Sequence, residues 1–236
     1  MNNLKFFHDL SLQSRRVLSD PKRLRNKEAA QLTYRPRSLD ERRRPIGESR
    51  ETVSMQTQSF DSAREAFAFI ESLDGFHSID GLTRALDRSL GLFGLDNFIL
   101  TGLPTPEQRF EQLVILQQWP TGWFELYARN DYVRVDPVIR MCGMTVDPFE
   151  WDEAPYDPEL EPRAAEVMKR AAEHGMVRGF CVPIHLATGY GACLSMSGVH
   201  PDLSSRNKPA IHLMALYVFA RARKIIGRNR LATAVH

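Results

Sequence analysis

The sequence contains few cysteines and no long apolar run. Among its 236 residues only three are cysteine, Cys142, Cys181 and Cys193. An odd number of widely spaced cysteines argues against a disulfide framework and a tetrahedral zinc site, and it is typical of reduced thiols in the cytoplasm. The apolar runs are far shorter than a membrane span, which excludes an integral membrane protein. A secretory signal is not expected, because no apolar core follows a charged start.

Motifs for catalysis and for metal binding are also scarce. No nucleotide- or phosphate-binding motif is present, and Cys181 and His185 lie too far apart on a predicted strand to form a nucleophile–base pair. Acidic residues crowd the stretch 147–161, but prolines interrupt it, which indicates a solvated surface loop. The protein is therefore not expected to be an enzyme, and neither a metal nor a cofactor is expected.

The charged residues are distributed unevenly, although the formal net charge is only +2. Residues 1–58 contain 13 Lys and Arg but 7 Asp and Glu, whereas residues 59–236 have a net charge of −4. The N-terminal stretch also lacks sustained apolar periodicity, so we predict a basic, disordered extension over residues 1–58. A basic arm attracted to nucleic acid is one interpretation. The favoured one is a solvated tail, or upstream sequence ahead of a true start at Met55.

Apolar periodicity begins near Phe60 and predicts a folded domain over residues 59–228. A first helix is expected with Asp61 or Ser59 as its cap and Phe67 on its apolar face, and a second with Asp80 as its cap. The remaining pattern predicts strands at 97–103 and 113–118, helices at 121–129 and 160–173, a hairpin of strands 177–186 and 190–198, and a last helix at 204–228. This order predicts an α+β fold, layered around a mostly antiparallel sheet.

The chemistry is concentrated in an aromatic-rich segment in the middle of the chain. Trp123 and Tyr127 are four residues apart, so their rings share one face of the predicted helix. Asp136 and Pro137 are typical of a helix N-cap and the first helical residue, and Trp151 adds another large ring. Each aromatic alone is best explained by packing. Together, an indole N–H, a phenol O–H and a carboxylate among apolar residues suit a pocket for a small polar head group.

These residues carry a family resemblance. Trp123, Tyr127, the Asp136-Pro137 pair, Trp151 and Gly179 resemble the autoinducer-binding domain of LuxR-type quorum-sensing transcription regulators, over about residues 60–227. The resemblance implies an α-β-α sandwich around a five-stranded antiparallel sheet, similar to PAS and GAF domains, with the ligand between the sheet and one helical layer.

The resemblance also implies the ligand, an N-acyl-homoserine lactone, and the roles of individual residues. Trp123 would donate to the lactone carbonyl, Asp136 would accept from the amide N–H, and Ser195 would donate to the amide carbonyl. The other expected ligand contacts are Tyr127 on the acyl side and Trp151 and Tyr156 over the head group. The expected lining of the acyl chain consists of Phe98, Leu100, Leu116, Val138, Met176, Cys181 and Cys193.

Two positions depart from the family pattern. Trp119 stands where family members often have a tyrosine that faces the amide carbonyl, and it supplies a bulkier donor. Val138 replaces a polar hydroxyl of some relatives, so a 3-oxo group on the acyl chain gains less there.

The resemblance ends before the second half of a regulator. Residues 229–236 match the start of a linker, and no helix-turn-helix domain follows them, so direct DNA binding by this chain is not expected. A homodimer, or a heterodimer with a full-length LuxR-type regulator, is expected through the last helix. A natural sensor without its DNA-binding domain and a shortened regulator both stay open. The alternative functions are a ligand-independent dimerisation partner that inhibits a full-length regulator and, less favoured, a lactone-processing enzyme.

Overall fold

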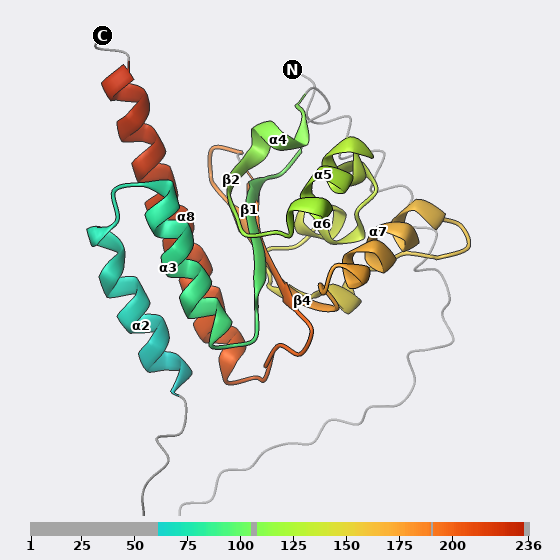
Figure 1. Ribbon diagram of the computed structural model, residues 1–236, viewed down its shortest axis with the longest axis horizontal. Helices are drawn as coiled ribbons and strands as arrows, with labels where there is room; N and C mark the ends of the chain where they lie inside the picture. Colours follow the sequence, from blue (N-terminus) through green and yellow to red (C-terminus); the bar gives the residue numbers. More distant parts are fainter. Residues whose placement is uncertain (1–60, 105–107, 190, 234–236) are drawn as a thin grey trace, which may run out of the picture. The chain divides into compact units, whose positions relative to one another are not determined.

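A five-stranded antiparallel sheet forms the middle of the fold (Figure 1). The computed structural model describes residues 61–104, 108–189 and 191–233. The strands are β1 (Asn97–Gly102), β2 (Val114–Gln117), β3 (Phe149–Glu150), β4 (Arg178–His185) and β5 (Gly191–Gly198). The α-helices are α2 (Ser62–Ser72), α3 (Ile79–Gly91), α4 (Phe110–Leu113), α5 (Thr121–Arg129), α6 (Pro137–Cys142), α7 (Pro162–Glu173) and α8 (Asn207–Thr233). The predicted extension over residues 1–58 lies outside the described residues.

The strand order is β2-β1-β5-β4-β3, and every neighbouring pair is antiparallel. The predicted β4–β5 hairpin is present, and its turn places Gly189 at φ +81°, which glycine adopts without strain. Strand β5 lies between β1 and β4, so Ser195 of β5 pairs with Ile99 of β1 on one side and with Cys181 of β4 on the other. Residues from three strands thus meet at the middle of the sheet.

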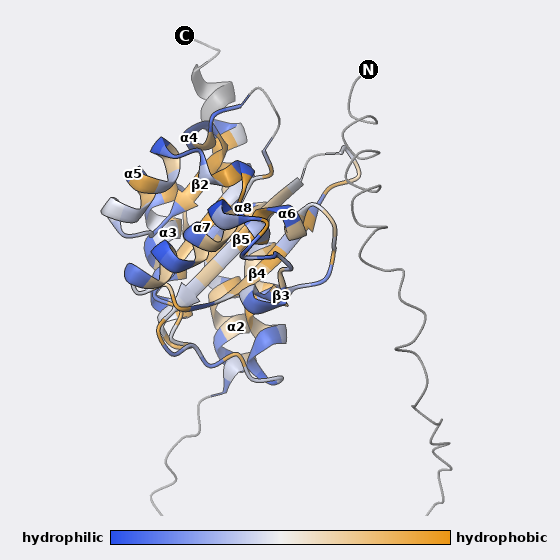
Figure 2. Ribbon diagram, turned by 90° about the vertical axis from the view of Figure 1, so that its right-hand side faces the viewer, coloured by the Kyte–Doolittle hydropathy of each residue, from blue (hydrophilic) through white to orange (hydrophobic). Residues whose placement is uncertain are grey.

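Helices cover both faces of the sheet, which confirms the predicted α-β-α sandwich (Figure 1). Helices α2, α3 and α8 pack on one face with the side chains of Phe98 and Leu100. Helices α5, α6 and α7 lie over the other face, where Ile99 is buried. Figure 2 shows the hydrophobic parts of the ribbon gathered along the strands and the inward sides of the helices. The alternation of side chains along a strand therefore divides the core into two layers.

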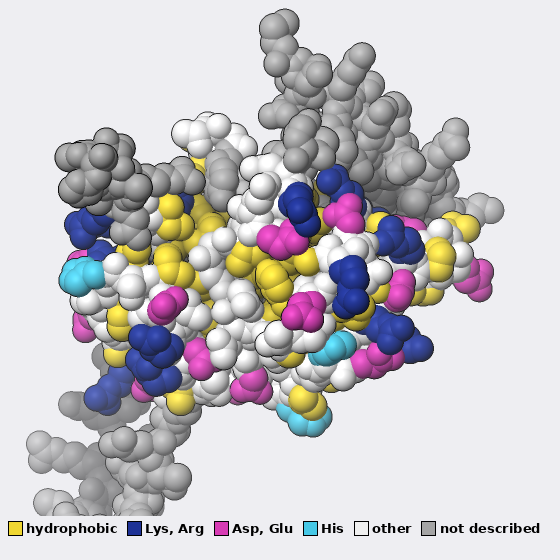
Figure 3. Space-filling view, turned by 45° about the horizontal axis from the view of Figure 1, so that its top comes forward, with side chains coloured by type: hydrophobic (Ala, Val, Ile, Leu, Met, Phe, Trp, Pro, Cys, Tyr) yellow, Lys and Arg dark blue, Asp and Glu magenta, His cyan; other side chains and the backbone are white. Residues whose placement is uncertain are grey.

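The surface is mixed in character. On the face seen in Figure 3, hydrophobic side chains gather toward the middle and acidic and basic side chains border them. Within the described residues, α8 is the longest helix, and neither it nor any other helix combines the length and apolarity that crossing a membrane would require.

Several local predictions are wrong. The second helix is capped by Ser78, whose hydroxyl accepts from the Gly81 N–H at 3.2 Å, and Asp80 lies in its first turn. The side chain of Phe67 is 57% exposed, so it is not on the buried face of α2. Neither α4 nor β3 was predicted, because elements of four and two residues are too short to show a period.

Candidate functional site

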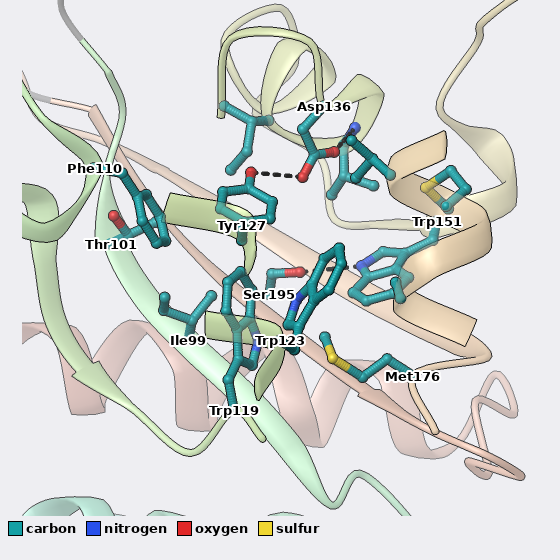
Figure 4. A pocket seen from close by; sticks show the side chains of 15 residues that line it. Ile99, Thr101, Phe110, Trp119, Trp123, Tyr127, Asp136, Trp151, Met176 and Ser195 are labelled. Atoms are coloured by element: carbon teal, nitrogen blue, oxygen red, sulfur yellow. Dashed lines mark hydrogen bonds between the residues drawn. The ribbon is translucent and has the colours of Figure 1, made fainter. Parts of the chain in front are cut away.

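A cavity lies between the sheet and the layer formed by α5, α6 and α7 (Figure 4). Its volume is about 20 Å³, enough for about one water molecule. Its walls are mostly aromatic and aliphatic, with few polar groups. The lining residues are Ile99, Thr101, Phe110, Trp119, Trp123, Tyr127, Asp136, Val138, Ile139, Trp151, Val167, Met168, Ala171, Met176 and Ser195.

Helix α5 supplies one wall. Trp123 and Tyr127 are one helical turn apart and each is 1% exposed, with ring centroids 5.5 Å apart in an edge-to-face arrangement. The ring centroid of Tyr127 is 5.1 Å from that of Trp119 and 4.8 Å from that of Phe110. The rings hold one another in place, because each packs against at least one neighbour in the wall.

Asp136 is the N-cap of α6 and binds Tyr127. Its Oδ1 accepts from the Val138 N–H at 2.8 Å, and its Oδ2 accepts from the Tyr127 hydroxyl at 2.8 Å (Figure 4). Burial raises the pKa of Asp136 to about 6, although these two hydrogen bonds favour the charged form. Burial and the neighbouring carboxylate raise the pKa of Tyr127 well above its usual value, so its hydroxyl stays a donor. A carboxylate has about four acceptor sites, so Asp136 can still accept from a further donor.

Trp151 and Ser195 form a second polar pair on the opposite side of the cavity. The Trp151 Nε1–H donates to Ser195 Oγ at 3.0 Å, which leaves the serine's own O–H to donate elsewhere. The indole lies directly on Gly179 of β4, at a position where any Cβ would overlap the ring. Glycine is thus required at residue 179 for Trp151 to reach the cavity.

The indole nitrogen of Trp123 has no hydrogen-bond partner among the described residues. Within the part of the chain that the structure describes, the buried side-chain polar atoms without a partner are Trp123 Nε1 and Ser197 Oγ. Trp123 lines the cavity and Ser197 does not. An unsatisfied buried donor costs about 1–3 kcal/mol. A carbonyl oxygen bound in the cavity would remove this cost.

The structure brings most of the sequence-predicted site residues to the cavity. Seven of the nine line it, namely Trp119, Trp123, Tyr127, Asp136, Val138, Trp151 and Ser195. Tyr156 is half-buried in the loop after Trp151, and Cys181 is buried beside Cys142, and neither is in the cavity wall.

Some residues that were predicted to contact the acyl chain lie on the face of the sheet opposite the cavity. Phe98, Leu100 and Leu116 are in the core beneath α2, α3 and α8, so the prediction that they line the cavity is wrong. Met176 does line the cavity. Sequence reasoning missed Ile99 and Thr101, which strand alternation places on the face opposite Phe98. It also missed the α7 residues Val167, Met168 and Ala171, although the spacing of Val167 and Ala171 puts them on one helix face.

The site can bind a small molecule that has both carbonyl and N–H groups. Trp123 and Ser195 supply donors, Asp136 supplies an acceptor, and the surrounding rings supply apolar contact. Such a ratio of few polar groups to many apolar ones is typical of small-molecule pockets.

Known proteins are similar to this chain in sequence. The family described as autoinducer binding domain matches residues 78–222. Transcriptional activator protein BjaR1 of Bradyrhizobium diazoefficiens is 54% identical over 166 residues, which cover 70% of this chain and 69% of the relative. The HTH-type quorum sensing-dependent transcriptional regulator RpaR of Rhodopseudomonas palustris is 38% identical over 173 residues, which cover 71% of this chain and 70% of the relative.

A solved structure has the same fold at low sequence identity. It is the N-acylhomoserine lactone dependent LuxR family transcription factor CepR2 of Burkholderia cenocepacia, with a TM-score of 0.52 and 15% identity, covering 72% of this chain and 98% of that one. The similarity supports the sandwich architecture.

Proposed function

The chain belongs to the autoinducer-binding domain family of LuxR-type quorum-sensing regulators, and on that premise we propose that its cavity binds an N-acyl-homoserine lactone as a signal. One observation supports the proposal most strongly: the Trp123 N–H is buried in the cavity wall without a partner among the described residues. A lactone carbonyl is an acceptor that fits this donor.

The other polar groups of the ligand match the remaining polar groups of the wall. The amide N–H donates to Asp136, and the amide carbonyl accepts from the Ser195 hydroxyl. A neutral hydrogen bond contributes about 1 kcal/mol, and one to the Asp136 carboxylate about 1.5–3 kcal/mol. Each buried methylene of the acyl chain adds about 0.8 kcal/mol. The polar groups therefore orient the ligand, and the acyl chain supplies much of the affinity.

Ligand binding requires the cavity to widen. A volume of about 20 Å³ is too small for a lactone ring and its acyl chain, so the side chains of the helical layer move outward on binding. The ligand then forms part of the core between the sheet and α5–α7. Binding to the folded state alone stabilises it by about 2.7 kcal/mol at a ligand concentration of 100 Kd. Signal binding and folding are thereby coupled.

The outer face of α8 is the proposed dimerisation surface. Leu213, Leu216 and Tyr217 are 38%, 37% and 50% exposed, and their spacing places them on neighbouring turns of the helix. A second copy of this chain, or a full-length LuxR-type regulator, would cover this apolar face.

A thermal-shift panel tests the ligand class. N-acyl-homoserine lactones of graded acyl length are expected to raise the melting temperature in a length-dependent manner, and homoserine lactone without an acyl group is expected to raise it little. If no member raises the melting temperature of protein that circular dichroism shows to be folded, the proposal is wrong, and a ligand-independent interaction domain is favoured.

Replacing Trp123 with phenylalanine should separate binding from stability. Phenylalanine keeps a smaller aromatic ring and lacks the N–H, so lactone affinity should fall by at least about 1 kcal/mol, roughly fivefold, in isothermal titration. The free energy of unfolding without ligand should fall less than in Trp151→Phe, because both changes remove the same ring volume but the Trp123 N–H has no partner among the described residues. Trp151→Phe is the matched control: it removes an N–H that Ser195 accepts, so it should lower the free energy of unfolding in urea. Equal behaviour of the two variants would contradict the assignment.

Lactone affinity should depend on pH through Asp136. The carboxylate accepts the ligand N–H only when ionised, and its pKa before binding is raised to about 6. Below about pH 6, binding must first remove a proton, so affinity should fall roughly tenfold per pH unit, and it should be flat above about pH 7. Titrations between pH 5 and 7.5 measure this slope. Asp136→Asn should bind weakly at every pH without the slope, and a wild-type affinity that is flat down to pH 5 would exclude an ionised Asp136 as the acceptor.

A further inference from the structure

The three cysteines come together in a buried cluster outside the cavity wall. Cys142, Cys181 and Cys193 are free thiols, each 0% exposed, and their sulfur atoms all lie within 4.8 Å of one another. The sulfur atoms of Cys142 and Cys181 are 3.1 Å apart. The cluster has no part in the lactone contacts proposed above.

The register of the sheet explains why residues so far apart in sequence meet here. Cys181 and Pro183 are two residues apart on β4 and so share one face, and Cys193 of β5 pairs directly with Pro183. That face is the one beneath α6. Cys142, the last residue of α6, places the third thiol beside Cys181 on this face of the sheet.

We propose that Cys142, Cys181 and Cys193 form a binding site for a soft, thiophilic ion that takes three sulfur ligands. The ion is trivalent arsenic, whose charge neutralises three thiolates. Trivalent arsenic has a lone pair and binds three sulfur atoms in a pyramid, so at about 2.3 Å from the arsenic, taking the zinc–thiolate distance as a guide, the sulfur atoms are about 3.4 Å from one another. The Cys142–Cys181 separation of 3.1 Å is already close to this value, and the other separations, of up to 4.8 Å, must contract by at most about 1.4 Å. Soft thiolate ligands favour soft ions over oxygen-seeking ones such as magnesium or calcium.

Charge decides between the candidate ions. Each thiol loses a proton on binding, so the three thiolates carry a charge of −3. The site with its bound ion then has a net charge of 0 for a trivalent ion, −1 for a divalent ion and −2 for a monovalent ion. A net charge in a fully buried site is costly unless it is paired. The carboxylate of Asp136 lies close enough to Cys193 for the two groups to repel each other when charged. A neutral product is therefore favoured.

The reaction needs no oxidant or reductant. Arsenous acid, As(OH)₃, reacts with three thiols so that three As–S bonds form, three As–O bonds break and three water molecules leave. Arsenic and sulfur keep their oxidation states.

Zinc suits the cluster less well. Structural zinc takes four ligands, and the cluster supplies three within the described residues. His185, whose ring is next to the cluster, directs its Nε2–H at the carbonyl oxygens of Cys142 and Thr145, both at 3.0 Å, so this nitrogen is not available as a fourth ligand.

An ion bound here would act on the neighbouring cavity. Helix α6 begins at its cap Asp136 and ends six residues later at Cys142. Bonds from Cys142 to β4 and β5 would fix this short helix against the sheet, and with it the carboxylate. This coupling to signal binding rests on the proposed function, whereas binding of the ion does not.

Arsenite added to the reduced 236-residue chain tests the proposal. We expect one arsenic per chain, three sulfur neighbours in the X-ray absorption spectrum, and protection of all three thiols from alkylation by iodoacetamide. Zinc, the divalent control, should bind at least tenfold more weakly. Two sulfur neighbours, protection of fewer than three thiols, or tighter binding of zinc would overturn the proposal.

Single variants give a second test. Cys142→Ser, Cys181→Ser and Cys193→Ser should each weaken arsenite binding at least tenfold while circular dichroism shows the native fold. Unchanged affinity in any folded variant would overturn the three-thiol site. If a variant does not fold, the absorption spectrum and the alkylation pattern of the unaltered chain decide the matter without it. Lactone titration with and without arsenite then measures the coupling separately.

Discussion

Replacing Asp136 with asparagine is expected to weaken lactone binding by about 10- to 100-fold at pH 7.5. Among the described residues that line the cavity, the Asp136 carboxylate is the one charged group, and a hydrogen bond to a charged group contributes about 1.5–3 kcal/mol. Asparagine has nearly the same shape, and its oxygen can still cap α6 by accepting the Val138 N–H. The loss in affinity, measured by isothermal titration, therefore reports the charge and not the helix cap.

Asp131→Asn is the matched control for this variant. Asp131 is exposed, forms an ion pair with Arg134 at 2.6 Å and does not line the cavity. Its replacement should leave lactone affinity within about twofold of the original, because an exposed ion pair contributes little. If both variants bind the lactone as tightly as the unaltered protein, Asp136 does not hold the ligand.

Replacing Gly179 with alanine should damage both the fold and the site. The added Cβ would overlap the indole of Trp151, so the ring must leave its place and give up its hydrogen bond to Ser195. Overpacking of this kind costs about 1–3 kcal/mol. The displaced ring also removes one side of the cavity, so we expect lactone affinity to fall at least tenfold in addition to the loss in the free energy of unfolding.

Gly198→Ala separates these two effects. Its Cβ would overlap the backbone oxygen of Gly94, at a place that does not border the cavity, so this variant should lose stability by a similar amount. Urea denaturation gives the stability of each variant, and titration under conditions where both are folded gives the affinity. Similar affinities in the two variants would mean that Trp151 does not shape the ligand site.

The sequence predicted best those features that depend on strong local patterns. Helix α5 begins at Thr121 and ends at Arg129 as predicted, because its aromatic residues recur at the helical period. Pro137 follows the cap Asp136 as predicted, because proline is favoured at the first helical position. These local features fixed the relative positions of Trp123, Tyr127 and Asp136.

The sequence did not predict which side chains of a strand face which layer of helices. In β1, Phe98 and Ile99 are both apolar and both buried, so hydropathy does not indicate which one faces α5 and which one faces α8. The cysteine cluster is hidden for the same reason, since it depends on the register of β4 against β5 and on where α6 ends. The partnerless Trp123 nitrogen depends on the tertiary fold, which determines the groups around it.

The most direct test of the central claim is the nuclear magnetic resonance signal of the Trp123 indole N–H during titration with an N-acyl-homoserine lactone. The chain has three tryptophans, so three indole signals are expected, and Trp123→Phe identifies the one that belongs to Trp123. We predict a downfield shift of that proton signal on binding, because a nitrogen without a partner gains a carbonyl acceptor, and a smaller change for Trp151, which already donates to Ser195. A lactone that binds and raises the melting temperature while the Trp123 signal stays in place would contradict the account.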